Sequence, residues 1–305
     1  MAKRLLVFAH AGLCNRLLPL VSGWRAAHLL GRRLVVCWAD APRRTGMPYE
    51  GDRSVHFNDV FQNEIEEVSV QEVSALAGVK WFTDHRGMNL GRWKAPKDLV
   101  LKDPSVIVGN TIPKDLDDEL VAVRTSRLFG VEGDQPTLDF LHRQKVSYLE
   151  APPIVKELRP YFSRLKPVPR LAQTVAEYRS KMTTGMLGVH VRKTDFPWRK
   201  PAVDENERVA AICDAAMKRR AASKLFLSTD SPDTDAWFRR RYGDAIVSYA
   251  CPAKYSNNAD GAELGVVDLY LLSQARWIMG TNHSTFSVTA WLLSKNASLE
   301  GEWWF

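Results

Sequence analysis

The sequence has few cysteines and no long apolar run, and both features exclude classes of protein. The four cysteines, Cys14, Cys37, Cys213 and Cys251, form no CxxC pair. A zinc ribbon is therefore disfavoured, and so low a cysteine content in 305 residues favours a reducing compartment. No stretch approaches the roughly 18 apolar residues that cross a bilayer, and the run Leu5–Ala9 is too short for a signal peptide. We expect a bacterial cytoplasmic protein without a transmembrane segment, and leave peripheral membrane contact open.

Two nucleotide-binding signatures are also missing. No GxGxxG follows an expected strand, which disfavours a Rossmann dehydrogenase. No helix–turn–helix, zinc or RNP-like motif is present, so we expect no nucleic-acid partner. The net charge of +7 favours an anionic partner, although the basic residues are scattered in short runs that are typical of solvated helix faces.

Short apolar strands alternate with helices in both halves of the sequence. In the first half we expect strands at 5–9, 33–38, 80–83 and 105–108 and helices at 15–30 and 115–129. In the second half we expect strands at 185–192, 224–228, 245–249 and 277–280 and helices at 170–182, 206–222, 233–242, 266–274 and 284–294. This alternation is typical of an α/β fold with open parallel sheets. Five prolines between residues 151 and 170 place a domain boundary near 166–169.

The segment Gly188-Val-His-Val-Arg-Lys-Thr-Asp195 carries the strongest chemical signal. Side chains alternate along a strand, so His190 and Arg192 point the same way at its carboxyl end. The planar guanidinium of Arg192 can bind a diphosphate through paired, charge-assisted hydrogen bonds. The structural alternative is a salt bridge at the strand end, for example between Arg192 and Asp195.

This segment resembles the HxRxTD motif of the GDP-fucose-dependent fucosyltransferases. The similar enzymes are the α-1,6 and nodulation types and, more distantly, the α-1,2 and protein O-fucosyltransferases. Three further segments resemble that superfamily in the same order: Gly12-Leu-Cys-Asn-Arg16, Phe226-Leu-Ser-Thr-Asp-Ser231, and Val267-Asp268 running on to Asn282-His-Ser-Thr-Phe-Ser287. Residues 41 to 165 match nothing.

The resemblance implies an α/β enzyme of the GT-B type, with two Rossmann-like domains facing each other across a cleft. Residues 1–166 would form the acceptor-side domain and residues 167–305 the GDP-sugar-binding domain. The expected activity is an inverting transfer of fucose, or a related sugar, from a GDP-sugar to a hydroxyl of a glycan-type acceptor. Because these families mostly work without metal, we expect no metal and no other cofactor.

The resemblance also assigns roles to individual residues. Arg192 and Asp195 would be catalytic, with Arg192 on the diphosphate. The remaining donor-binding residues would be Gly12, Asn15, Arg16, His190, Asp230, Asp268, Ser284, Thr285 and Phe286, with His190 and Asp268 on the guanine side.

Several of these residues have a purely structural alternative. Gly12 would permit a tight turn, and Asn15 and Asp230 would cap helices. Asp268 would be an acid in the first turn of a helix.

Ser284, Thr285 and Phe286 open an expected helix, whose N-terminal N–H groups favour phosphate.

Two features separate the sequence from other glycosyltransferases. Asp233-Thr-Asp235 matches a metal-binding DxD string, but it follows Pro232 in the expected first turn of a helix, where acids are favoured. The glutamate proposed as general base in the α-1,6 enzymes is replaced by Lys200 or a neighbour. The base therefore stays open among His10, Asp40, Asp84, His85 and Asp195. The missing glutamate leaves one alternative, a non-catalytic GDP-sugar or glycan-binding protein with the same fold.

Overall fold

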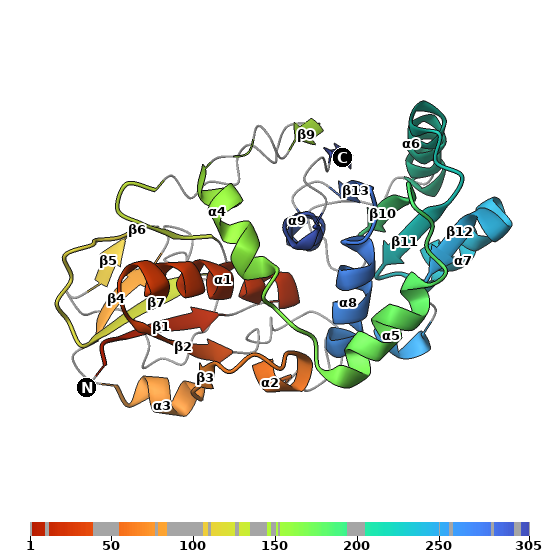
Figure 1. Cartoon of the computed structure of the whole chain (residues 1–305). Helices are drawn as coiled ribbons and strands as arrows, with labels where there is room; N and C mark the ends of the chain where they lie inside the picture. Colours follow the sequence, from red (N-terminus) through yellow and green to blue (C-terminus); the bar gives the residue numbers. More distant parts are fainter. Residues whose placement is uncertain are drawn as a thin grey trace. The chain divides into compact units, whose positions relative to one another are not determined.

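The computed structural model describes residues 2–9, 12–38, 55–76, 79–83, 106–108, 111–125, 128–134, 145–147, 151, 153–193, 205–249, 251–255, 259–281, 284–295 and 300–304. The chain divides into two compact units, drawn in Figure 1. Unit 1 comprises Met1–Leu138 and Pro152–Leu165, and unit 2 comprises Asp139–Ala151 and Lys166–Phe305. This division differs from the predicted boundary after residue 166 because residues 139–151 group with the C-terminal half. Their strand β9 (Lys145–Ser147) pairs antiparallel with β14 (Glu300–Trp304).

The sheet of unit 1 is parallel and has the strand order β3-β2-β1-β7-β4-β5. The strands are β1 (Arg4–Ala9), β2 (Arg33–Trp38), β3 (Glu66–Glu67), β4 (Lys80–Thr83), β5 (Val106–Val108) and β7 (Leu120–Thr125). The short strands β6 (Thr111–Ile112) and β8 (Gly130–Val131) pair with each other. The helices are α1 (Leu13–Leu29), α2 (Phe57–Val60), α3 (Val70–Ser74) and α4 (Pro153–Phe162).

Helix α1 packs along β1 and β2 and also contacts α4 (Figure 1). Gly23 permits the close approach, because a Cβ atom there would lie 2.3 Å from Cγ2 of Val7. Arg25 of α1 donates to Asp134, after β8, at 2.6 Å and to Glu157 of α4 at 3.0 Å. Apolar packing against the sheet and an ionic network centred on the buried Arg25 thus hold the described part of the unit.

The helix predicted at 115–129 is wrong, because residues 120–125 form β7 between β1 and β4. The segment Leu-Val-Ala-Val-Arg-Thr is buried from its second residue to its last. A strand that is buried on both faces does not alternate apolar and polar residues. Its continuous apolar run therefore cannot be distinguished by periodicity from that of a buried helix. The acids at 115–118 lie before the strand and start no helix.

The sheet of unit 2 has the order β12-β11-β10-β13-β14-β9, and its pairs are parallel except for β9. Its other strands are β10 (Leu187–Val191), β11 (Leu225–Thr229), β12 (Ile246–Ser248) and β13 (Trp277–Thr281). The helices are α5 (Pro169–Arg179), α6 (Glu205–Arg220), α7 (Pro232–Tyr242), α8 (Ala259–Leu272) and α9 (Thr285–Leu293), with 3-10 turns η5 (Gly243–Ala245) and η6 (Pro252–Tyr255). The strands predicted in this half agree with those observed to within two residues at each end.

Strand β10 is central, and its two faces differ as the alternation predicts. Val189 and Val191 lie in a buried cluster with side chains of α6 and α7, including Cys213 and Phe238. Gly188 faces the carboxyl end of α8, where a Cβ atom would come within 2.9 Å of Cδ1 of Leu272 and within 2.7 Å of Cβ of Ala275, just after the helix. After β10, the next two strands, β11 and β12, add to one side of it, and the following strands, β13 and β14, add to its other side. This reversal makes a topological switch point, where open α/β sheets bind ligands.

Both sheets confirm the expected α/β class with Rossmann-like units. Among the described helices, none is long and apolar enough to cross a membrane.

The packing of Gly188 gives a first prediction. Gly188→Ala should lower the free energy of unfolding by about 1–3 kcal/mol, because the added methyl group overpacks the β10–α8 contact. The melting temperature should fall by roughly 2–8 °C. Gly12→Ala is the matched control, since its Cβ atom would meet nothing within 4 Å. Equal melting temperatures for the two variants would contradict the packing described here.

Candidate functional site

Polar residues gather at the carboxyl edge of the unit 2 sheet. His190 and Arg192 lie at the end of β10, Asp230 follows β11, and Thr281 ends β13. Because parallel strands end at the same edge, segments as far as 97 residues apart in sequence meet there. This edge includes the switch point between β10 and β13.

His190 joins β10 to the start of α9. Its Nδ1 lies 2.8 Å from Oγ of Ser287, and its ring stacks on Phe286 with centroids 4.8 Å apart and planes inclined by 22°. His190 and Ser287 are both buried. Two of the predicted donor-binding residues, His190 and Phe286, are therefore in direct contact, and Ser287 is a partner that the sequence analysis did not assign.

The backbone around Arg192 is fixed from both neighbouring strands. The N–H of Arg192 donates to Oγ1 of Thr281 at 3.0 Å, and that hydroxyl donates to the carbonyl of His190 at 3.1 Å. The N–H of the next residue, Lys193, donates to Oδ1 of Asp230 at 2.7 Å. The guanidinium of Arg192 thus extends from a backbone held on both sides, while its side chain is only half-buried.

The helix-cap alternative for Asp230 is wrong. The N-cap of α7 is Ser231, whose hydroxyl accepts from the N–H of Thr234 at 3.2 Å. Asp230 instead accepts from the N–H of Lys193 and so holds the peptide that follows Arg192.

Lys193 makes a second contact that the sequence did not predict. Its Nζ lies 3.2 Å from Oε2 of Glu205, at the start of α6, and both side chains are largely buried. This ion pair joins the end of β10 to the first turn of α6. Asp195 and the Lys200 position fall between them, at 194–204, outside the described residues.

The first turn of α9 begins at this edge, as predicted. Ser284 is its N-cap residue and caps no backbone N–H with its side chain. Its Oγ is buried and has no hydrogen-bond partner among the residues that the structure describes. Thr285 and Phe286 follow and are half-buried. The N–H groups of such a turn, together with the helix dipole, form a site that favours an anion.

Asp268 is buried in the middle of α8, so the prediction of a first-turn acid is wrong. Its Oδ2 accepts from Oγ of Ser228 at 3.0 Å and from Nζ of Lys254, in η6, at 3.2 Å. Its Oδ1 has no partner in the described part of the chain. Burial raises the pKa of Asp268, whereas the nearby ammonium of Lys254 and the Ser228 hydroxyl act in the opposite direction.

The DxD string has the helical setting that was predicted for it. Asp233 and Asp235 lie in the first turn of α7, which begins at Pro232. Asp233 is exposed, and Oδ2 of Asp235 accepts from Nε of Arg239 at 2.6 Å. Among the described residues, no group of three His, Cys, Asp or Glu side chains is placed to hold a metal ion.

Unit 1 contains the other predicted site residues, in α1 and just before it. Gly12 is the N-cap residue, with φ −66° and ψ 167°. Any residue adopts this conformation, so the tight-turn explanation for Gly12 is wrong. Asn15 lies inside α1 and does not cap it. Arg16 is buried, with its guanidinium carbon 4.6 Å from the ring centroid of Trp38.

Arg124 is a buried cation that the sequence analysis missed, because residues 115–129 were predicted to be helical. It lies near the end of β7, beside Phe8, with its guanidinium carbon 5.4 Å from the Phe8 ring centroid. Its Nε and Nη1 have no hydrogen-bond partner within the described ranges. Burial lowers the pKa of its guanidinium.

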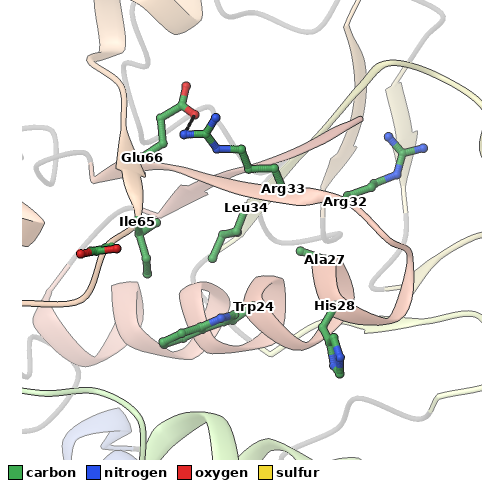
Figure 2. A pocket seen from close by; sticks show the side chains of 9 residues that line it. Trp24, Ala27, His28, Arg32, Arg33, Leu34, Ile65 and Glu66 are labelled. Carbon is green, nitrogen blue, oxygen red and sulfur yellow. Dashed lines mark ion pairs between the residues drawn. The ribbon is translucent and has the colours of Figure 1, made fainter. Parts of the chain in front are cut away.

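A surface pocket of unit 1 lies away from these residues (Figure 2). It is lined by residues of α1, of the amino end of β2 and of the segment before β3. Two of its lining residues pair with each other, Arg33 with Glu66 at 3.2 Å, and Arg32 donates to the carbonyls of Leu116 and Asp118. None of the predicted site residues lines it, so we do not assign the site here.

His10, Asp40, Asp84, His85 and Asp195 all fall outside the described residues.

No protein-family model matches the sequence, and no curated protein matches it by sequence. The fold, in contrast, is similar to that of solved fucosyltransferases. The NodZ α-1,6-fucosyltransferase, in a crystal soaked with GDP-fucose, is 17% identical with a TM-score of 0.57, over 96% of this chain and 93% of that one. A structure of the NodZ enzyme from Bradyrhizobium gives the same identity and TM-score.

Two more distant structures have the same fold. A variant of FUT1 from Arabidopsis thaliana in complex with GDP is 13% identical with a TM-score of 0.55, over 97% of this chain and 69% of that one. POFUT1 in complex with GDP-fucose is 12% identical with a TM-score of 0.51, over 99% and 98% of the two chains. These solved structures come from the superfamily that the sequence motifs resemble, and at such identities they establish the fold.

The hydroxyl of Thr281 gives a prediction about the stability of this edge. Thr281→Val keeps the shape of the side chain but removes the hydrogen-bond partner of Arg192 N–H and of the His190 carbonyl. The free energy of unfolding should fall by about 1–3 kcal/mol in urea titrations. Thr289→Val is the matched control, because the Thr289 hydroxyl is buried without a partner in the described structure. Its removal should cost nothing or stabilise the fold, and equal losses in both variants would refute the bridging role of Thr281.

Proposed function

We propose that this protein is an inverting glycosyltransferase that moves fucose, or a related sugar, from a GDP-sugar to a hydroxyl of a glycan-type acceptor. One observation carries the proposal: three separate motif segments meet at the carboxyl edge of the unit 2 sheet, in a fold similar to structures solved with GDP-fucose or GDP. The motifs and the fold together support the proposal better than either does alone, because both indicate the same edge of the same sheet.

The proposed donor site uses the residues at this edge in two groups. Asp268, whose buried Oδ1 has no partner among the described residues, and His190, stacked on Phe286, lie on the guanine side. Arg192 and the first turn of α9, with Ser284 and Thr285, bind the diphosphate. The motif resemblance assigns donor-binding roles to Gly12, Asn15 and Arg16 of unit 1 as well.

The reaction is a displacement at the anomeric carbon of the sugar. The acceptor oxygen attacks that carbon, the bond from carbon to the β-phosphate oxygen breaks, and GDP departs with the bonding electrons. Negative charge grows on the departing diphosphate, and Arg192 stabilises it. The proton of the acceptor hydroxyl passes to a base. Asp195, which follows the motif strand, is the candidate from unit 2.

Three further features belong to this proposal. The donor diphosphate is neutralised by cationic side chains without metal or other cofactor. The helical setting of Asp233 and the ion pair of Asp235 with Arg239 support this, because neither acid is placed as a shared metal ligand. We further propose a bacterial cytoplasmic protein, with the acceptor bound by residues 1–166.

Binding of nucleotides tests the donor. GDP should bind with a micromolar-range dissociation constant in calorimetry, in the presence of EDTA, and UDP should bind at least about tenfold more weakly because the guanine-side contacts are lost. GDP-fucose should raise the melting temperature by mass action. Equal affinity for GDP and UDP would refute the guanine assignment. Binding that EDTA abolishes and manganese restores would refute the metal-free site.

An assay of sugar transfer distinguishes a glycosyltransferase from a non-catalytic GDP-sugar-binding protein. The replacement of the expected glutamate near Lys200 leaves open a protein that binds a GDP-sugar without turning it over. Release of GDP from GDP-fucose with a glycan acceptor supports the enzyme, and tight donor binding without hydrolysis or transfer supports the binding protein.

Substitution of Arg192 tests the leaving-group role. Arg192→Ala should reduce transfer by about 10²- to 10³-fold, because one preorganised donor to a developing negative charge typically contributes that much. Arg192→Lys should also be poor, since a point charge cannot form the bidentate contact. Both variants should melt close to the wild-type temperature.

Arg276→Ala is the matched control. Arg276 precedes β13 at the opposite edge of the same sheet and lies over the ring of Trp277, with its guanidinium carbon 5.0 Å from the centroid. It should keep wild-type turnover. If Arg192 forms only a surface ion pair, its loss should cost about 0–1 kcal/mol of stability and leave turnover intact, which would refute the proposed site.

A further inference from the structure

The structure assigns a positioning role to Lys254: it fixes Asp268 through Oδ2, which leaves the buried Oδ1 without a partner among the described residues and able to accept from the N–H donors of a guanine base. Lys254 lies in η6, outside every motif that resembles the fucosyltransferases. This inference rests on the proposed function, because it takes guanine as the base that Asp268 meets.

The contacts of Asp268 are asymmetric. Both hydrogen bonds, from Lys254 Nζ at 3.2 Å and from Ser228 Oγ at 3.0 Å, reach the same oxygen. The Lys254 and Asp268 side chains are only 3% and 7% exposed, so water does not replace either partner. Oδ1 is buried and has no partner among the described residues. A buried carboxylate oxygen without a donor is costly, unless a ligand supplies the donor.

An ionised carboxylate suits guanine better than other bases. Its oxygen carries two lone pairs and only accepts. The edge of guanine presents an N1–H and a 2-amino group side by side, both donors, whereas uracil presents a single N–H. A protonated Asp268 would place a donor against these donors. The site therefore depends on keeping Asp268 ionised while it is buried.

The surroundings of Asp268 show that Lys254 is what opposes protonation. Burial raises the pKa of Asp268, and the like charge of Asp235, in α7, raises it further. Lys254 contributes both charge attraction and a hydrogen bond that lower it, and Ser228 contributes a hydrogen bond. Arg239 is engaged with Asp235, with Nε 2.6 Å from Oδ2.

Two tyrosines near Asp268 are neutral. Burial raises the pKa values of Tyr249 and Tyr255 above the usual range, so both phenols stay protonated. Their rings flank the ammonium of Lys254, with centroids 5.9 Å and 5.0 Å from Nζ. Such aromatic contacts hold the ammonium in place beside Asp268.

The pH dependence follows from these signs. Guanine binding needs the ionised carboxylate, so affinity is lost as the pH falls through the pKa of Asp268. Without Lys254 that pKa rises, and the loss begins at a higher pH. Lys254→Met should therefore weaken GDP binding at least about tenfold at pH 7 and shift its pH profile upward.

The experiment measures dissociation constants of GDP and inosine diphosphate by calorimetry from pH 5.5 to pH 9. Inosine diphosphate lacks the 2-amino group and reports on base recognition. Wild type should prefer GDP, and Lys254→Met should lose most of this preference, while Lys254→Arg keeps it. Lys181→Met is the matched control, because Lys181 also lies over a tyrosine ring, 4.1 Å from the Tyr178 centroid. It should bind as wild type does.

A double-mutant cycle separates positioning from a general structural effect. Lys254→Met added to Asp268→Asn should weaken GDP binding no further, because Lys254 acts through Asp268. If Lys254→Met does not fold, Lys254→Gln, which also lacks the charge, should show the same upward shift of the pH profile. An unshifted profile with wild-type affinity in either variant would overturn the role of Lys254. Failure of wild type to bind GDP would instead refute the proposed function.

Discussion

The parallel pairing of β10 with both β11 and β13 is the constraint on which the candidate site depends. Register brings His190 beside Ser228 on one side, and the Thr281 hydroxyl closes the end of β10 from the other. The position of each motif residue is then determined by the strand end that carries it. The sheet therefore determines where a ligand can bind. The strand order reverses between β10 and β13, and Arg192 and the first turn of α9 both lie at the edge where this reversal occurs.

Buried polar groups at this edge are arranged in pairs, and the pairing decides which charges a ligand meets. Asp268 is matched by Lys254, Asp235 by Arg239 and Glu205 by Lys193. Breaking a buried pair leaves an uncompensated charge and typically costs several kcal/mol. These pairs therefore fix elements to one another: η6 to α8, successive turns of α7, and the end of β10 to α6. Each pair cancels most of its own field.

Alternation and motif spacing predicted most of unit 2 and the residues of its candidate site. The period-two pattern of residues 187–191 correctly separated Val189 and Val191 from His190, because only one face of β10 packs against α6 and α7. The same approach failed for β7, where burial on both faces removes the pattern that distinguishes strand from helix. It also missed α4, because two prolines in Pro153–Phe162 argue against a helix unless one stands at its start. The role inferred for Lys254 could not be predicted from the sequence, because it depends on a contact with Asp268, 14 positions away on another element.

Net charge is a weaker guide to this protein than the placement of a few cations. The excess of +7 comes largely from surface runs such as Arg239-Arg240-Arg241, whose middle residue is exposed and whose neighbours pair with acids. Unit 1 presents a different case in Arg124, a cation buried at the end of β7 with two N–H groups unmatched within the described ranges. An unmatched buried guanidinium costs stability, and burial lowers its pKa. Arg124 lies beside β1, the strand that leads into α1, and an anion placed there would lower this cost.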